Sequence, residues 1–282
     1  MKRFYFKSSP YTGFYWDGEL LEEFNSEYQN VKMINHPEMG NTMILDDYIM
    51  VAEKDEHQYH ELITHPNCLQ LKSFNKALII GGGDGLCAEE LLKYPFESVT
   101  LVEIDKAVSD MAEKYFKSGL NNTFQNPRFK CLYQDALTFF PTTEKYNFIA
   151  LDLNDPTEEF MHSHPLYSGD FYNSCKSSLE DDGIMVVQIG CPHLFTKHFK
   201  HNVELLKKQF KYVAIYGQYM RCYGTYQYFA ACSDNIDLLH PDVKFIDNQM
   251  NKFGISNLKL YNTNMHKAML MHNNEIIDIL EY

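Results

Sequence analysis

The sequence has few basic residues and no cluster of them. Lysine and arginine total 25 against 38 aspartate and glutamate residues, a formal net charge of −13. Because binding to nucleic acid depends on a basic face that neutralises phosphates, this composition argues against a nucleic-acid partner. The same negative field attracts cationic substrates, although acidity also serves solubility alone.

The sequence also lacks features of secreted, membrane-spanning and metal-binding proteins. Its seven cysteines are odd in number and have no C-x-x-C spacing, which indicates reduced thiols in a cytoplasmic protein. No apolar run approaches the length of about 18 residues that spans a membrane, and residues 1–16 contain no apolar core of a signal peptide. The histidines show no H-E-x-x-H spacing, so we expect no bound metal and no resident cofactor.

The central feature that is present is residues 76–106, KALIIGGGDGLCAEELLKYPFESVTLVEIDK. The letters ALII predict a buried strand, and LCAEELL predicts a helix. Between them the glycines, Gly81 and Gly83 among them, allow a sharp turn and a close approach to a ligand. A second strand ends at Glu103, roughly twenty residues past the loop, where an acid holds ribose hydroxyls in nucleotide-binding folds.

Asp84, inside this loop, argues against a ligand that carries phosphates. Residues 83–88, GDGLCA, satisfy the dinucleotide pattern G-x-G-x-x-A. The carboxylate of Asp84, however, would lie where a pyrophosphate sits at a helix N-terminus. An adenosyl sulfonium compound has no phosphate and carries a positive charge, so it fits this loop. A tight strand–helix turn without a ligand is the alternative.

Strands and helices alternate over the rest of the chain. Further strands are expected at 129–133, 146–151, 184–188, 212–216 and 226–232. This alternation predicts an α/β protein with a Rossmann-like, doubly wound, seven-stranded sheet that binds its ligands at the carboxyl ends of the strands. We assign residues 56–282 to this domain.

Residues 1–55 predict a different structure, a small N-terminal antiparallel β domain. Short apolar runs alternate with turn residues there, and no charged motif of its own suggests chemistry. Tyr11–Trp16 and Glu19–Phe24 are expected to be two strands joined by a turn at Asp17-Gly18.

Carboxylates follow the predicted strands of the large sheet. Asp84, Glu103, Asp135 and Asp152 each come directly or closely after a strand, and Asp155 follows three residues later. Single members of this series could cap helices or form turns. A sheet that is only a scaffold has no need of the whole series, so we expect an acidic pocket that binds cations or sugar hydroxyls.

Several motifs, taken in their order and spacing, resemble those of the polyamine aminopropyltransferases, the family of the spermidine synthases. They include GNTMILDDYIMVAEKDEHQYHELITH (40–65), LIIGGGDG (78–85), VTLVEID (99–105), LDLNDP (151–156), LYSGDFY (166–172) and LYNTNMHKA (260–268). The resemblance extends from about Glu27 to the C-terminus. It implies the class I S-adenosylmethionine-dependent fold, a transferase of polyamine and spermidine biosynthesis, and a homodimer or homotetramer.

The resemblance also implies roles for individual residues. Decarboxylated S-adenosylmethionine would be the co-substrate, with its nucleoside part held by Gln29, Gly81, Gly83, Glu103, Asp135 and Ala136. Asp84 would bind the ammonium group of the aminopropyl arm, and Asp152 would be the catalytic base. The diamine channel would be lined by Tyr59, His60, Asp155, Gln188 and Tyr223.

The sequence departs from the family pattern mainly where the amine is recognised. Leu86 replaces a glycine after the loop, and Leu153-Asn154 replaces two small residues. Segment 157–165, which corresponds to the family's lid, is longer and lacks a Gly-Pro pair, and the loop 223–226 is shorter. These changes leave the accepted amine open among putrescine, cadaverine, agmatine, an aminopropylated product and spermidine.

Two other functions stay open at this point. A methyltransferase that uses S-adenosylmethionine shares the glycine loop and the ribose-binding acid, but its cofactor has a carboxylate that Asp84 would repel. A non-catalytic protein that binds nucleoside or polyamine fits the altered lid but has no use for a base at Asp152. The sequence therefore predicts aminopropyl transfer to a diamine, putrescine before others, which gives spermidine and methylthioadenosine.

Overall fold

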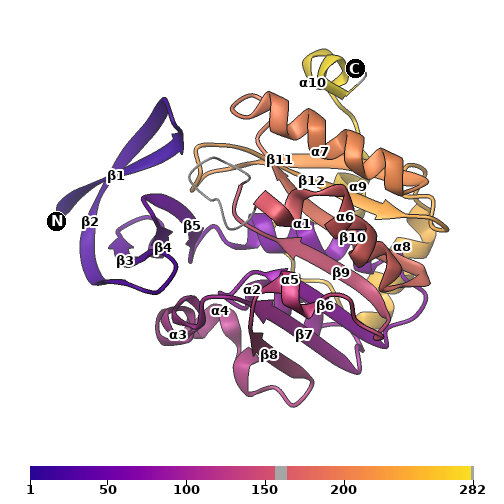
Figure 1. The fold of residues 1–282 in the computed structure, drawn as a ribbon, viewed down its shortest axis with the longest axis horizontal. Coiled ribbons are helices and arrows are strands. Elements are labelled where there is room, and N and C mark those ends of the chain that lie inside the picture. The colour runs from indigo at the N-terminus through magenta and orange to yellow at the C-terminus, as the bar shows by residue number, and fades with distance from the viewer. Residues whose placement is uncertain (156–163, 281–282) are drawn as a thin grey trace.

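The structure is a computed structural model that describes residues 1–155 and 164–280, and these residues form two sheets (Figure 1). The smaller sheet is antiparallel, and its strands follow one another in chain order. They are β1 (Lys2–Ser9), β2 (Thr12–Asn25), β3 (Asn30–His36), β4 (Gly40–Leu45) and β5 (Tyr48–Ala52). This confirms the expected N-terminal antiparallel sheet, whereas a domain boundary at residue 55 stays a prediction.

The larger sheet has seven strands in the order β11-β12-β10-β9-β6-β7-β8. They are β6 (Lys76–Gly81), β7 (Ser98–Glu103), β8 (Phe129–Tyr133), β9 (Tyr146–Asp152), β10 (Leu179–Gly190), β11 (Tyr212–Met220) and β12 (Thr225–Ser233). Strands β8, β7, β6, β9 and β10 are parallel, and β12 pairs antiparallel with both β10 and β11. The predicted Rossmann-like sheet is confirmed.

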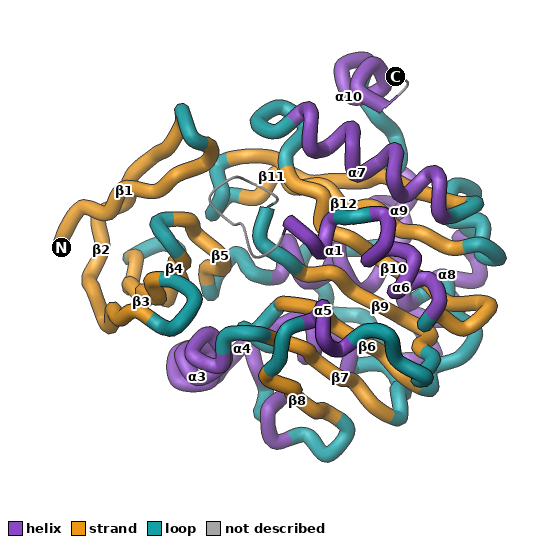
Figure 2. Tube along the Cα trace, in the orientation of Figure 1, coloured by secondary structure: helices purple, strands orange, loops and turns teal. Residues whose placement is uncertain are grey.

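Helices pack around the strands (Figure 2). They are α1 (His57–Cys68), α2 (Leu86–Leu92), α3 (Lys106–Tyr115), α4 (Lys117–Leu120), α5 (Ala136–Phe139), α6 (Gly169–Ser177), α7 (Thr196–Gln209), α8 (Val243–Phe253), α9 (Thr263–Met269) and α10 (Asn274–Leu280). No helix within the described residues is long and apolar enough to cross a membrane.

Both faces of the large sheet are buried, which explains its near-continuous apolar strands. In β6, Ala77 and Ile79 belong to the core shared with α1 and α2, and Leu78 and Ile80 to the core shared with α6 and α7. This follows from the alternation of side chains along a strand. In β6 and β9 the polar residues therefore lie at or next to the strand ends, and the acid Asp152 ends β9.

The N-terminal sheet packs against the large domain through α3. Val31, Met33 and Met43 share a buried cluster with Val108 and Met111 of that helix. Because α3 follows β7 directly, this contact holds the small sheet beside the carboxyl ends of the parallel strands. Figure 1 shows the indigo sheet on that side of the molecule.

The prediction of a turn at Asp17-Gly18 is wrong. Strand β2 continues through both residues, and the reversal lies one strand earlier, between β1 and β2. Asp17 forms a bidentate ion pair with Arg3 on β1, at 2.9 Å for each of the two contacts. A Cβ on Gly18 would lie 2.9 Å from the carbonyl oxygen of Asn35. The glycine thus permits close strand packing rather than a turn.

A buried carboxylate ties the C-terminal segment to α1. Glu61 is 2% exposed and accepts the backbone N–H groups of Lys259, Leu260 and Tyr261 at 2.8, 2.9 and 2.8 Å. A buried N–H left without an acceptor costs about 1–3 kcal/mol. Glu61 is therefore a fixed point between the first and last parts of the large domain.

Glu61→Ala is expected to lower the free energy of unfolding by about 1–3 kcal/mol, because the buried N–H of Tyr261 loses its acceptor. Urea unfolding followed by circular dichroism measures the change. Glu204→Ala, on the exposed face of α7, is the control and is expected to change stability little. Equal effects of the two substitutions would contradict this account of Glu61.

Candidate active site

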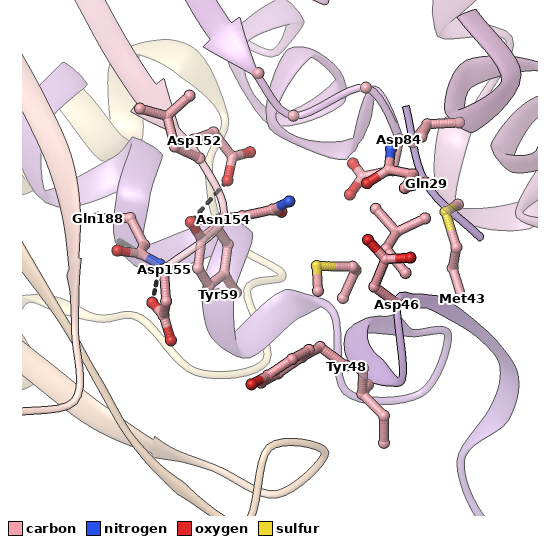
Figure 3. A pocket seen from close by; sticks show the side chains of 18 of the residues that line it. Gln29, Met43, Asp46, Tyr48, Tyr59, Asp84, Asp152, Asn154, Asp155 and Gln188 are labelled. Atoms are coloured by element: carbon pink, nitrogen blue, oxygen red, sulfur yellow. Dashed lines mark hydrogen bonds between the residues drawn. The ribbon is translucent and has the colours of Figure 1, made fainter. Parts of the chain in front are cut away.

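A cavity of about 450 Å³ lies where the carboxyl ends of the parallel strands face the N-terminal sheet (Figure 3). All of the residues predicted as site residues line it. They are Gln29, Tyr59, His60, Gly81, Gly83, Asp84, Glu103, Asp135, Ala136, Asp152, Asp155, Gln188 and Tyr223. The structure thus brings them together in one place, and their individual roles stay a prediction.

The glycine loop after β6 lies directly on Asp152, the last residue of β9. A Cβ on Gly81 would lie 2.2 Å from the Asp152 carbonyl oxygen, and one on Gly82 would lie 2.5 Å from its Oδ2 atom. Both glycines have a positive φ, of 76° and 64°, which other residues rarely adopt. The loop needs glycine here because the neighbouring strand ends in an acid.

The Asp152 side chain is held at one oxygen and left without a partner at the other. The Tyr59 hydroxyl donates to Oδ1 at 2.7 Å (Figure 3). Oδ2 is buried and has no hydrogen-bond partner among the residues that the structure describes. Burial, reinforced by the nearby Asp84, raises the pKa of Asp152 to about 6, although His60 and Tyr59 act in the opposite direction. Such a carboxyl can accept a proton near neutral pH.

His60 lies in α1 among three acids. Its Nδ1–H donates to the backbone carbonyl of Glu56 at 2.8 Å, with the Glu56 carboxylate at 3.3 Å. Its Nε2 atom is 3.8 Å from Asp84 Oδ1. Burial disfavours the imidazolium, but Glu56, Asp84 and Asp152 outweigh it and raise the pKa of His60 to about 9. His60 therefore brings a positive charge among these three acids.

Three cavity acids also hold local backbone structure. Asp84 Oδ1 accepts the Leu86 N–H at 2.9 Å, and Asp135 Oδ1 accepts the Leu137 N–H at 2.8 Å, so each acid holds the start of a helix. Glu103 Oε1 accepts the N–H of the residue two positions on, at 2.8 Å. The helix-capping alternative is thus true of Asp135, the N-cap of α5, whereas Asp84 precedes Gly85, the N-cap of α2. Both acids also line the cavity.

Glu103 is the most strongly buried of these three acids. It is 9% exposed, and burial raises its pKa to about 7 despite two backbone N–H donors that act in the opposite direction. Gln29, from the small sheet, reaches the same end of the cavity, and its amide donates to Asp105 Oδ2 at 2.8 Å. This link joins the N-terminal sheet to the strand end that carries Glu103.

Asp155 is surrounded by amides at the other end of the cavity. Gln188 of β10 and Gln227 of β12 both donate to Asp155 Oδ1, the second at 3.3 Å. Burial raises the pKa of Asp155. Tyr167 donates to the Asn154 carbonyl at 3.0 Å and so fixes the stretch between the two acids.

Sequence reasoning missed Gln227 and Tyr167. An amide within the otherwise aromatic and apolar run TYQYFAAC was a signal for Gln227, because a buried strand seldom carries a polar side chain without a partner. The motif LYSGDFY contains Tyr167 but does not show that its hydroxyl turns towards the strand end.

Tyr223 lies in the turn between β11 and β12 and donates its hydroxyl to the Met50 carbonyl of β5 at 2.6 Å. It therefore connects the large sheet to the small one across the cavity. Of the altered segment 157–165, positions 157–163 lie outside the described residues. Among the described residues, no three His, Cys, Asp or Glu side chains are placed to hold a metal ion.

The fold and the site together define a class of enzyme. A Rossmann-like sheet with a glycine loop and an acid at the end of the second parallel strand is the arrangement of enzymes that bind a nucleoside at the carboxyl ends of their strands. The chain matches the sequence profile of the spermine/spermidine synthase domain over residues 56–244 and that of the spermidine synthase tetramerisation domain over residues 18–53. The chain belongs to the spermidine synthase family of polyamine aminopropyltransferases, which are transferases.

Individual relatives agree with this assignment. The polyamine aminopropyltransferase of Nitrosomonas europaea is 34% identical over 93% of this chain and 81% of its own length. That of Alkaliphilus metalliredigens is 35% identical over 88% of this chain and 86% of its own. The crystal structure of spermidine synthase from Thermotoga maritima has a TM-score of 0.88 at 26% identity, over 99% of this chain and 94% of that one.

The contact between Tyr59 and Asp152 makes a prediction about pH. The profile of kcat/KM is expected to rise through about pH 6 as Asp152 loses its proton, because this ratio reports groups of the free enzyme. Tyr59→Phe removes a donor that stabilises the carboxylate, so it is expected to raise the pKa of Asp152 and move this rise to higher pH. Tyr226→Phe, an exposed tyrosine, is the control. An unmoved profile in Tyr59→Phe would refute the assignment of this rise to the Asp152 carboxyl.

Proposed function

We propose that this protein transfers the aminopropyl group of decarboxylated S-adenosylmethionine to a diamine, putrescine before others, and releases spermidine and methylthioadenosine. The observation that carries the proposal is the Asp152 carboxyl, which has one buried oxygen without a partner, is held by Tyr59 at the other, is raised in pKa and is close to a second acid in the loop. A spermidine synthase solved in complex with the transition state analogue AdoDATO supports it, with a TM-score of 0.91 at 26% identity over 99% of this chain and 95% of that one.

We assign the nucleoside to the end of the cavity beside β6, β7 and α5. The Glu103 carboxyl binds the ribose hydroxyls, and Asp135 faces the adenine amino group. Ala136 is small and buried, so it leaves room for the base. The absence of side chains at Gly81 and Gly83 lets the loop backbone lie against the ligand, with Gln29 closing the site from the small sheet.

The aminopropyl arm extends from the nucleoside towards Asp84. The His60 Nε2 atom lies 3.8 Å from the Oδ1 atom of this acid. The ammonium group of the arm is the cation that Asp84 binds when substrate is present. The negative charge of Asp84 also explains the preference for the decarboxylated compound, because the carboxylate of S-adenosylmethionine would face Asp84 directly.

Asp152 acts as the base. Alkylamines have a pKa of about 10, like lysine, so the diamine arrives protonated. Asp152 takes a proton from the attacking ammonium, and the freed lone pair forms the new C–N bond while the C–S bond breaks. Its electron pair leaves with sulfur as a neutral thioether, so no general acid is needed. Alignment of the two substrates among fixed charges supplies the rest of the acceleration.

The diamine lies between Asp152 and Asp155. Tyr59 and His60 flank the attacking nitrogen, and the distal ammonium is bound by Asp155, whose Oδ1 atom is already oriented by Gln188 and Gln227. Tyr223 closes this end from the β11–β12 turn. A diamine, putrescine before others, is the acceptor we propose, because both charges of a diamine then meet an acid.

The match to a tetramerisation domain over residues 18–53 supports an oligomer. We propose a homodimer or homotetramer in which the N-terminal sheets meet. A cytoplasmic location stays a prediction from the cysteine pattern.

Purified protein supplied with decarboxylated S-adenosylmethionine is expected to convert putrescine to spermidine faster than it converts cadaverine, agmatine or spermidine. Chromatography of the polyamines measures the products. Asp152→Asn is expected to lower kcat by a factor of about 100 or more, as for loss of a general base. It should still bind methylthioadenosine, because the amide oxygen retains the Tyr59 contact. The exposed Asp110→Asn is the control. No product with any amine would disprove the proposed function.

The role of Asp84 separates aminopropyl transfer from methyl transfer. Decarboxylated S-adenosylmethionine is expected to bind at least about tenfold more tightly than S-adenosylmethionine, a difference of about 1.4 kcal/mol. Asp84→Asn is expected to reduce this preference, because the amide no longer repels the carboxylate. Isothermal titration calorimetry gives both affinities. Tighter binding of the carboxylated compound would favour a methyltransferase.

A further inference from the structure

The turn between β11 and β12, residues 221–224, forms the wall of the cavity at its amine end. It carries Tyr223 and leads into Thr225 and Gln227, which also line the cavity. In Figure 1 this orange hairpin end reaches from the large sheet towards the indigo N-terminal sheet. The Gly224 N–H donates to the Met220 carbonyl at 3.0 Å and closes the turn locally. Contacts outside the hairpin then set where the turn lies relative to the amine site.

One carboxylate, that of Asp55, holds this turn. Asp55 Oδ2 accepts the backbone N–H of Cys222 at 2.8 Å, and the Arg221 guanidinium lies 3.5 Å from Oδ1. The Asp55 side chain is fully buried, whereas Arg221 is 55% exposed. The carboxylate is thus shielded from water, and its contact with the backbone of the turn is a charge-assisted hydrogen bond.

Asp55 is in turn fixed on its own side. The Gln58 amide donates to Asp55 Oδ1 at 2.8 Å, and the Asp55 N–H donates to the Ala52 carbonyl at the end of β5 at 2.9 Å. The residue therefore sits between the last strand of the small sheet and the start of α1. Tyr59 and His60, both assigned to the attacking nitrogen, follow within the first turns of that helix.

Asp55 thus joins three parts of the protein that meet at the amine. They are β5, whose Met50 carbonyl accepts the Tyr223 hydroxyl at 2.6 Å, the start of α1, and the β11–β12 turn. Asp55 does not line the cavity itself. Asp55 can therefore affect substrate binding only by positioning the β11–β12 turn.

We propose that Asp55 is a positioning residue for the diamine: by holding the Cys222 N–H it fixes Tyr223 relative to Asp155 and so sets the length of amine that the site accepts. This rests on the proposed function, since it concerns the acceptor of that reaction. Asp55 is not expected to affect nucleoside binding, because Glu103 and Asp135 form the nucleoside end of the cavity on other strands.

The test compares Asp55→Ala with the wild-type protein. The KM for putrescine is expected to rise roughly tenfold, as for a buried N–H that loses its acceptor. The affinity for methylthioadenosine, measured by calorimetry, should not change. The ratio of kcat/KM for putrescine to that for cadaverine is expected to fall towards one. Asp55→Asn keeps an oxygen for the Cys222 N–H. Its putrescine KM and its diamine ratio are therefore expected to lie between those of the wild-type protein and those of Asp55→Ala.

Glu61→Ala is the matched control. Glu61 lies in α1, just after Asp55, is about equally buried and also binds backbone N–H groups, but those of residues 259–261, which are not part of the cavity wall. It is expected to lose stability without any change in the ratio between the two diamines. Unfolding temperatures of both variants show that each is folded under assay conditions.

Three results would overturn the inference. In the first, Asp55→Ala leaves the putrescine KM and the diamine ratio unchanged. In the second, it weakens methylthioadenosine binding as much as putrescine binding. In the third, Glu61→Ala shifts the diamine ratio to the same extent, which makes the effect one of stability alone. A wild-type protein that forms no product with any amine is a separate result, and it removes the proposed function together with this inference.

Discussion

The close packing of the glycine loop against the end of β9 is the constraint on which the site depends. With backbone alone at Gly81 and Gly82, the loop can lie on Asp152 and bury its Oδ2 atom. Burial raises the pKa of Asp152 into the range where it can exchange a proton. The same packing brings Asp84 near Asp152, so the geometry that shapes the loop also sets the charge of the site.

His60 carries a positive charge among the acids of the site, and this balance of charge explains the form of the site. His60 is positioned by the Glu56 carbonyl so that its other nitrogen faces Asp84. Without such a positive charge, the carboxyl groups of an acidic cavity would take up protons. The raised pKa values of Glu103 and Asp152 already indicate this tendency. Substrates that bring several positive charges are therefore the natural complement of this cavity.

The sequence was a good guide to the large sheet and to the acids, because both depend on local pattern. Apolar runs mark buried parallel strands, and an acid just after a run lies at the carboxyl edge whatever the helices do. Gln227 and Asp55 could not be found in this way. Their roles arise from contacts between residues 72 and 167 positions apart, with Asp155 and Cys222. The prediction of a turn at Asp17-Gly18 is wrong for a related reason. The glycine at position 18 allows close contact with the Asn35 carbonyl of the neighbouring strand, and the chain does not reverse there.

Three of the cavity acids each accept a hydrogen bond from a backbone N–H with one carboxylate oxygen. They are Asp84, Glu103 and Asp135. A substitution at any of them disturbs a helix start or a strand end as well as a ligand contact. The amine end is built differently, from a turn and from amides on separate strands. Evolution of a new acceptor amine can therefore proceed at one end of the cavity, while the adenosyl end is kept constant by the folding of the protein.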